Sequence, residues 1–300
     1  MTNRKQKKQL INYFLIAINI LLILCFQGCA SIKNINSDKP FFFVQLSDPQ
    51  IGFYPDSIKK EIAAYEKAVA DVNQLRPAFV VITGDLVNKA RDKDQLAEFK
   101  RITSMIDRNI PVYYTPGNHD VGNNPTQSDI DFYNSIYGYD RFSFEHNGSL
   151  FIGFNSSLIK VNTPKVEKEQ YDWLENELKK GKKAVHIILF CHIPFFINKP
   201  DEPDLYYDSG KTEGRNIEMV ERKKYLSLLE KYHVNAVFAG HLHQNSYGEY
   251  KNIQMVTTSA IGESLGKDPE GFQIITVNKK RIAHQYYNLD SIPTHINLMD

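Results

Sequence analysis

The sequence contains very little cysteine. Only three cysteines, Cys25, Cys29 and Cys191, occur among its 300 residues. Structural zinc sites are usually rich in cysteine, so a site of that kind is excluded. Any metal site in this chain must use histidine, carboxylate or amide ligands instead.

An excess of one charge is also missing. Lys plus Arg number 36 against 35 Asp plus Glu, a formal net charge of +1. The first 28 residues carry four of the bases and no acid, so without them 32 bases face 35 acids and the net charge is near −3. Such a balance gives no electrostatic case for binding nucleic acid, and we expect no nucleic-acid partner.

The sequence has one apolar run near its start. Basic residues 4–8 precede the run Leu10–Phe26, and Gln27-Gly28-Cys29 follows it. A basic region, an apolar region and a small residue before the break are typical of a secretory signal peptide. Gly28-Cys29 resembles the lipobox of bacterial lipoproteins, which implies that Cys29 is lipidated and becomes the first residue of the mature chain. Cys25 fits less well, because it follows the bulky Leu24.

An uncleaved membrane anchor is the alternative interpretation of this run. Its 17 residues include Asn12 and Asn19, which makes it short and polar for a bilayer span. We therefore expect a signal peptide at 1–28, a flexible polar tether at 29–40 and one domain at 41–300. The protein would be exported and lipid-anchored to the bacterial cell envelope. With Cys29 acylated, no cysteine pair remains for a disulfide.

From residue 41 onward, apolar strand-like runs alternate with helical patterns. The pattern predicts strands at Phe41–Leu46, Phe79–Thr83, Val112–Thr115, Arg141–Phe144, Leu150–Asn155, Val185–Cys191, Ala236–Ala239, Tyr247–Thr258 and Phe272–Tyr287. It predicts helices at Ile58–Leu75, Asp94–Asp107, Asp129–Tyr137, Val166–Lys180 and Glu218–Tyr232. The early alternation indicates parallel strands with right-handed crossovers, and the later hairpins indicate a mixed or second sheet. An α/β fold with two sheets between outer helices buries all these runs.

Five of the predicted strands end in residues that can bind metal. In an open α/β sheet, ligands gather outside the carboxyl ends of the strands. Each motif alone is an ordinary turn or helix cap, and only their joint occurrence indicates a site. The candidate residues are Asp48, Gln50, Asp85, Asn118, His119, His192, His241 and His243.

This donor set favours two metal ions over one. Mixed nitrogen and oxygen donors suit Mn, Fe, Zn or Co, and eight candidates are too many for one tetrahedral ion. Two ions about 3.5–4 Å apart can hold a phosphoryl group and stabilise both the attacking and the leaving oxygen. The donor set therefore predicts a dinuclear centre, of the kind that can hold a phosphoryl group.

The ordered motifs resemble those of the calcineurin-like metallophosphoesterase superfamily. They are Asp48-x-Gln50, Gly84-Asp85, Gly117-Asn118-His119-Asp120, His192 and Gly240-His241-x-His243, and the resemblance spans roughly residues 41–290. It implies a four-layer α-β-β-α double β-sandwich. It also implies a dinuclear-metal-dependent phosphoesterase that hydrolyses a phosphomonoester or phosphodiester by in-line attack of a metal-bridging hydroxide.

The resemblance also implies a role for each residue. Asp48, Asp85 and His243 would bind the first metal, with Gln50 beside them. Asp85 would bridge to a second metal, held by Asn118, His192 and His241. His119 would act as general acid for the leaving oxygen or stabilise the transition state. The two divalent ions would be Mn, Fe, Zn or Mg.

The chain departs from the family pattern at two positions. Gln50 stands where the usual motif has histidine, as in the subgroup of calcineurin-like phosphoesterase domain-containing proteins, and offers a weaker, harder oxygen donor. Asn88 stands where the serine/threonine phosphatase branch has the Asp of an Asp-Arg-Gly motif, which orients the catalytic histidine. Asp120 is left with two interpretations, a partner for His119 or a turn residue.

Substrate selection is expected to come from loops. The stretch Asn198–Arg215 contains Tyr206, Tyr207 and Arg215, which either contact a small phosphorylated substrate or phosphopeptide or simply pack the loop. The alternative function is a catalytically weak, lipid-anchored metal- or phosphate-binding protein of the same fold. Intact Asn118 and His119 argue against it. A metallo-β-lactamase-type hydrolase is excluded, because the chain lacks a His-x-His-x-Asp-His cluster.

Overall fold

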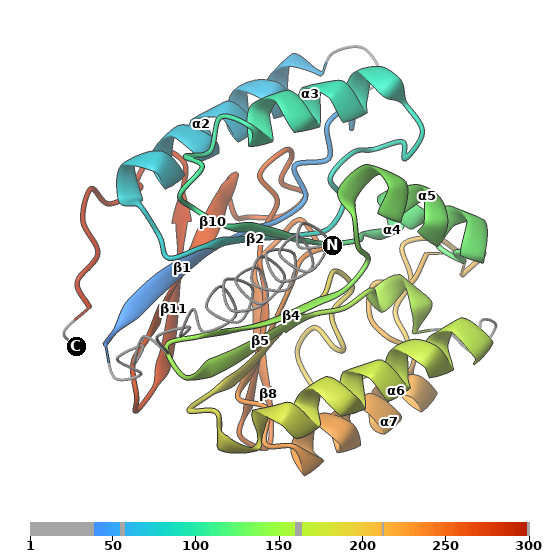
Figure 1. Cartoon of the computed structure of the whole chain (residues 1–300). Helices are drawn as coiled ribbons and strands as arrows, with labels where there is room; N and C mark the ends of the chain where they lie inside the picture. The colour runs from blue at the N-terminus through green and yellow to red at the C-terminus, as the bar shows by residue number, and fades with distance from the viewer. Residues whose placement is uncertain (1–38, 55–57, 160–163, 212, 299–300) are drawn as a thin grey trace, which may run out of the picture. The chain divides into compact units, whose positions relative to one another are not determined.

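A computed structural model describes residues 39–54, 58–159, 164–211 and 213–298 (Figure 1). The predicted signal peptide, Cys29 and nearly all of the predicted tether lie outside the described residues. The described residues belong to one folded unit, Ser37–Asp300. Within them, no helix is long and apolar enough to cross a bilayer.

Two β-sheets form the centre of the fold. The first has the strand order β11 (Ile282–Asn288), β10 (Gly271–Val277), β1 (Phe41–Leu46), β2 (Val80–Thr83) and β3 (Val112–Thr115). The second has the order β4 (Phe142–His146), β5 (Ser149–Gly153), β6 (Ile187–Phe190), β7 (Ala236–Ala239), β9 (Ile253–Thr257) and β8 (Ser246–Tyr250). Strands β1, β2 and β3 are parallel, as are β5, β6, β7 and β9. The pairs β1–β10, β10–β11, β4–β5 and β8–β9 are antiparallel.

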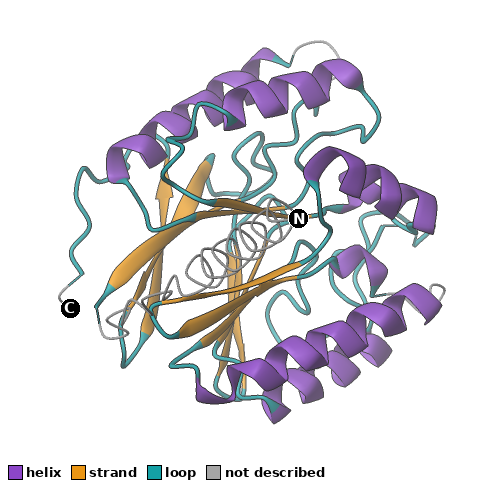
Figure 2. Cartoon of the chain, in the orientation of Figure 1, coloured by secondary structure: helices purple, strands orange, loops and turns teal. Residues whose placement is uncertain are grey.

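Helices cover the outer faces of both sheets (Figures 1 and 2). Helices α2 (Lys59–Leu75), α3 (Lys93–Thr103) and α5 (Gln127–Tyr137) pack on the first sheet, and α6 (Pro164–Lys180) and α7 (Met219–Lys231) pack on the second. A third, aromatic core lies between the sheets, where Phe79 stacks on Phe43 at 4.8 Å between ring centroids and meets Phe151 edge-on. The four-layer α-β-β-α fold predicted from the sequence is confirmed.

The boundaries differ from the predicted ones mainly at the ends of elements. Helix α3 begins after Asp92, whose side chain accepts hydrogen bonds from the backbone N–H groups of Asp94 and Gln95, and it ends at Thr103 rather than at Asp107. The short helix α4 (Asn118–Val121) was not predicted, because four residues are too few to show a helical period. This helix holds Asn118, His119 and Asp120, the polar residues that follow β3, on a single turn.

A buried polar cluster joins the two sheets beneath their carboxyl ends. The Gln45 side chain donates to Thr83 Oγ1 and to the carbonyl of Ala239, at 2.9 Å each, and accepts from Thr258 Oγ1 at 2.6 Å. Buried polar groups need such partners, and here the partners come from both sheets. The cluster therefore fixes the end of β1 and β2 against the end of β7.

Candidate metal centre

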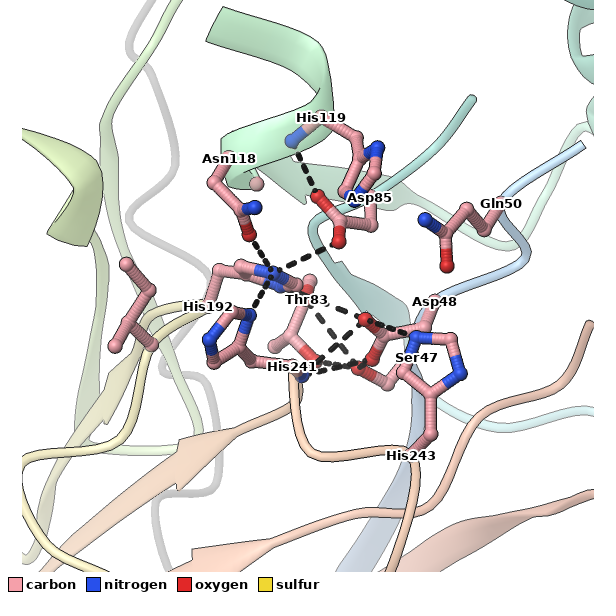
Figure 3. A network of polar contacts seen from close by, with 12 residues as sticks. Ser47, Asp48, Gln50, Thr83, Asp85, Asn118, His119, His192, His241 and His243 are labelled. Carbon is pink, nitrogen blue, oxygen red and sulfur yellow. Dashed lines mark hydrogen bonds and ion pairs between the residues drawn. The ribbon is translucent and has the colours of Figure 1, made fainter. Parts of the chain in front are cut away.

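The carboxyl ends of β1, β2, β3, β6 and β7 converge on one place (Figure 3). Two groups of buried side chains there have ligand atoms within 4.8 Å of one another. One group is Asp48, Asp85 and His243, and the other is Asp85, His192 and His241. Asp85 belongs to both, as a bridging carboxylate would. These are the two sets of residues that the resemblance assigned to two metals.

The backbone around these residues adopts an uncommon conformation. Five candidate ligands have positive φ, namely Asp48 at 49°, Gln50 at 35°, Asp85 at 47°, His241 at 72° and His243 at 52°. Such conformations cost on the order of 1–3 kcal/mol each for residues other than glycine and gather at functional sites. They turn the chain sharply where each strand ends, which directs the side chains inward.

Two glycines allow the strand ends to approach closely. A Cβ atom on Gly240 would collide with the side chains of Ser47 and Asp48, and one on Gly117 would collide with the Asp85 carboxylate. Any larger residue would push the loops apart. Glycine is therefore required in Gly-Asn-His-Asp and Gly-His-x-His because no side chain fits there, which the sequence pattern alone does not reveal.

Each histidine of the two groups is oriented by a backbone carbonyl. Nδ1 of His192 lies 2.8 Å from the Thr83 carbonyl, Nε2 of His241 lies 2.8 Å from that of Gly214, and Nδ1 of His243 lies 2.5 Å from that of Glu263. A carbonyl only accepts, so each of these nitrogens carries the proton. The other ring nitrogen is therefore unprotonated in the neutral imidazole and faces the centre, as in metal-binding histidines.

The inward-facing atoms are all electron donors. Nε2 of His192 lies 3.1 Å from Asp85 Oδ2, 3.1 Å from Asn118 Oδ1 and 3.2 Å from Nδ1 of His241. Nε2 of His243 lies 3.5 Å from Asp48 Oδ1. Lone pairs this close repel one another unless a proton or a metal cation lies among them. The donor set therefore fits metal ions.

The pKa values of the histidines also indicate that the centre favours a positive charge. Burial disfavours a charged imidazole, but the Asp85 and Asp48 carboxylates outweigh it and raise the pKa of His192 to about 10. Burial and the charge on His192 lower the pKa of His241 to about 3. The carboxylates thus favour a positive charge beside them, and metal ions would supply that charge in place of a proton.

Gln50 lies beside the first group and has an oxygen atom available as a donor. Its Nε2 donates to Asn88 Oδ1 at 3.1 Å, and its buried Oε1 has no hydrogen-bond partner among the described residues. In Figure 3 this oxygen lies on the side of the Gln50 side chain that faces Asp48. A buried acceptor without a partner is costly, and a metal ion would supply one.

His119 lies at the edge of the centre. Its Nδ1 lies 3.0 Å from the Asn88 carbonyl, which makes Nδ1 the protonated nitrogen and leaves Nε2 for a substrate. Burial lowers the pKa of His119, but the Asp85 carboxylate and the Asn88 carbonyl outweigh it and raise this pKa above its ordinary value. Metal cations would act in the opposite direction. The carbonyl of Asn88 thus orients the imidazole, as the aspartate of the Asp-Arg-Gly motif does in the serine/threonine phosphatase branch.

Asp120 is neither the partner of His119 nor a simple turn residue. Its carboxylate accepts hydrogen bonds from the backbone N–H groups of Gly117 at 2.8 Å, Leu86 at 3.0 Å and Val87 at 3.3 Å. It therefore ties the segment after β2 to the start of α4. This contact joins two segments more than thirty residues apart, so the local motif could not reveal it.

The predicted substrate residues divide into two environments. Tyr207 donates from its hydroxyl to the His241 carbonyl at 3.0 Å, and the Arg215 guanidinium lies over the Tyr207 ring at 5.2 Å. Tyr206 turns away and lines a small cavity, where its hydroxyl lies 3.4 Å from Glu218. Tyr207 and Arg215 therefore border the centre, and Tyr206 does not contact it.

Sequence reasoning missed Glu213. Its Oε1 lies 3.5 Å from Asn118 Nδ2, so the amide nitrogen of Asn118 points to Glu213 and the amide oxygen points to His192. Glu213 thus helps to select the side of the Asn118 amide that faces the centre. No local motif marks this residue, because its position follows from the path of the long loop.

Two further histidines lie away from the centre. His146 packs its ring on Phe41 at 4.6 Å, and Nε2 of His186 contacts the Asn278 carbonyl at 2.8 Å. Neither belongs to a group that could hold a metal among the described residues.

The substitution Asp120→Ala tests the structural role of this carboxylate. It leaves three buried N–H groups without their acceptor, so we expect the free energy of unfolding of the metal-loaded protein to fall by roughly 2–4 kcal/mol in urea denaturation. The control Asp129→Ala removes an exposed cap of α5 and should cost about 1 kcal/mol. Equal losses for the two variants would contradict the role given to Asp120.

Comparison with known proteins agrees with this geometry. The family model "Calcineurin-like phosphoesterase" matches residues 43–245. The human protein "Serine/threonine-protein phosphatase CPPED1" is 35% identical over 274 residues, which cover 84% of this chain and 85% of the relative.

Solved structures share the fold at low sequence identity. A purple acid phosphatase from Lupinus luteus superposes with a TM-score of 0.61 at 16% identity, covering 85% of this chain and 52% of that protein. A dimetal phosphatase from Danio rerio superposes with a TM-score of 0.59 at 14% identity, covering 83% and 96%. The two overlapping donor groups and the matched sequence lead to one conclusion: the chain belongs to the calcineurin-like phosphoesterase family.

Proposed function

We propose that the chain hydrolyses phosphoric monoesters at a dinuclear metal centre, with phosphoserine and phosphothreonine peptides as its substrate class. The observation that carries the proposal is the pair of donor groups that share Asp85. The relatives named as serine/threonine phosphatases support the substrate class, since the similarity extends over most of both chains.

The residues would divide between the two metals as follows. Asp48, Gln50, Asp85 and His243 would hold one ion, and Asp85, Asn118, His192 and His241 would hold the other. Two divalent ions would supply Lewis acidity and, because their four charges exceed those of the two aspartates, an attraction for phosphate. The chain itself fixes the donors, through the carbonyls that orient the imidazoles and through the His241 backbone N–H that donates to Asp48 at 3.0 Å.

His119 would transfer a proton to the leaving oxygen. Its ring is held at Nδ1 by the Asn88 carbonyl, and its backbone N–H donates to Asp85 Oδ1 at 2.9 Å. The imidazole is therefore positioned relative to the bridging carboxylate. A protonated Nε2 directed at the substrate is what a general acid requires.

The loop beside the centre offers contacts for the substrate. Arg215 and Tyr207 border the second donor group, where an arginine can pair with a phosphate or with an acidic peptide side chain. The catalytically weak binding protein is not favoured, because His119 is positioned but occupies no place in either donor group.

Turnover and metal content together test the function. The full chain should hydrolyse p-nitrophenyl phosphate and phosphoserine peptides with added Mn, Zn or Mg and lose activity with EDTA. Hydrolysis of bis-p-nitrophenyl phosphate reports diesterase activity.

The variant His119→Ala should lower kcat by roughly 10²–10⁴-fold and keep the metal, measured by elemental analysis. His295→Ala is the control, because His295 lies beside residues of β10 and β11 and belongs to neither donor group. Loss of metal in His119→Ala would refute its proposed role, and the absence of metal-dependent turnover would favour the binding protein.

Gln50→His tests the fourth donor of the first group. Imidazole is a stronger ligand for Zn or Mn than a neutral amide oxygen, so we expect the first metal to bind roughly tenfold or more tightly. Isothermal titration of the metal-free protein would measure this change. Unchanged affinity and stoichiometry would show that Gln50 is not a ligand.

We also propose that the protein is a lipoprotein acylated at Cys29, exported and held at the cell envelope. The support is the Gly28-Cys29 junction after the apolar run. Palmitate labelling in a bacterial host should be lost almost completely in Cys29→Ser and retained in Cys191→Ser, whose thiol is buried. Labelling that survives Cys29→Ser would refute the lipobox.

A further inference from the structure

The connecting segments at the two ends of the sheets carry opposite charge. At the metal-site end, the described segments contain more Asp and Glu than Lys and Arg, including the loop 191–218 and the segment 258–270. At the other end, the amino ends of the parallel strands, they contain nine bases and one acid, Asp107. We call this end the basic edge, and its bases are Lys39, Arg76, Arg108, Lys182, Lys183, Lys251, Lys279, Lys280 and Arg281.

All nine bases of the basic edge are exposed to solvent. Lys251 forms an ion pair with Glu230, and Asp107 lies next to Arg108 in the chain. The whole chain has nearly equal numbers of acids and bases, so an accumulation of this size at one end is not a consequence of composition. The molecule is therefore electrostatically polarised along the strand direction.

Contacts between the two sheets gather several of these segments. The Asn147 side chain donates to the Lys39 carbonyl at 3.3 Å, and the Val185 N–H donates to the Gly148 carbonyl at 2.8 Å. The neighbouring His186 contacts the carbonyl of Asn278, at the start of the turn that contains Lys280 and Arg281. The start of β1, the turn Gly181–Lys183 and the β10–β11 turn thus lie at the same end of the fold.

The chain enters the described fold at this edge. Lys39 and Pro40 directly precede β1, so the chain N-terminal to them connects to the fold at the end opposite the metal centre. The ten residues from Cys29 to Asp38 can reach at most ~35 Å when fully extended. An anchor at Cys29 would therefore keep the basic edge close to the bilayer surface.

We propose that the basic edge docks on a bilayer surface rich in anionic phospholipid and holds the metal centre toward the aqueous phase. Exposed lysines and arginines are attracted to such a surface when they come within roughly 10 Å of it at 0.1 M salt. The acidic excess at the opposite end is repelled by the same surface. Attraction at one end and repulsion at the other therefore select a single orientation.

This inference uses the anchor proposed above to bring the edge to the membrane, but the charge distribution does not depend on it. The experiment compares the full chain on neutral phosphatidylcholine vesicles and on vesicles that also contain phosphatidylglycerol. The ratio of the two partition coefficients, from co-sedimentation, reports the basic edge, because the anchor contributes to both. Partition into the neutral vesicles reports the anchor alone.

The test variant Lys182→Glu/Lys183→Glu/Lys280→Glu reverses three charges of the basic edge. The matched control Lys93→Glu/Lys165→Glu/Lys223→Glu changes the net charge equally on exposed positions of the outer helices. None of the six residues belongs to the metal centre, so turnover with p-nitrophenyl phosphate verifies folding.

We expect the wild-type ratio to exceed ten and to fall roughly tenfold or more in the test variant, while the control keeps most of it. Raising the salt from 0.1 to 1 M, which shortens the screening length to about 3 Å, should also abolish the ratio. If the wild-type protein partitions only weakly into neutral vesicles but its ratio still exceeds ten, the anchor is refuted and the basic edge is supported. A wild-type ratio near one, equal losses in both variants, or binding to a DNA duplex without a vesicle ratio would overturn the proposal.

Discussion

The carboxylate of Asp85 is the point on which the rest of the centre depends. It is the only side chain that belongs to both donor groups among the described residues. Its Oδ2 lies 3.1 Å from Nε2 of His192, and its Oδ1 accepts the backbone N–H of His119. One short strand end therefore joins the two donor groups and fixes their position relative to His119.

Backbone groups hold this arrangement. The donors repel one another, so they need restraint that does not use their inward-facing atoms. The structure supplies it from behind, through carbonyls that bind the outer ring nitrogens and through Asp120, which binds the N–H groups after Asp85. Burial of these contacts strengthens them, because the local dielectric is low. The folded chain thus prepares the centre for cations before they bind.

The sequence could predict the fold and the donors for a physical reason. Strand–helix alternation specifies parallel strands, and parallel strands bring their carboxyl ends to one edge of a sheet, so topology places Asp48, Asp85 and Asn118 of the first sheet together. His192 of the second sheet joins them because the carboxyl ends of the two sheets meet. The restraints could not be predicted in this way. The carbonyls of Thr83 and Gly214 carry no side-chain signature, and Glu213 reaches Asn118 only through the path of a long loop. The orientation of His119 by a carbonyl likewise explains how Asn88 can replace an aspartate.

Anomalous diffraction from crystals soaked in Mn tests the central claim most directly. The shared carboxylate of Asp85 predicts two peaks about 3.5–4 Å apart. One should lie among Asp48, Gln50, Asp85 and His243, and the other among Asp85, Asn118, His192 and His241. A single peak, or two peaks of which one lacks contact with Asp85, would contradict the account of a centre built on that residue.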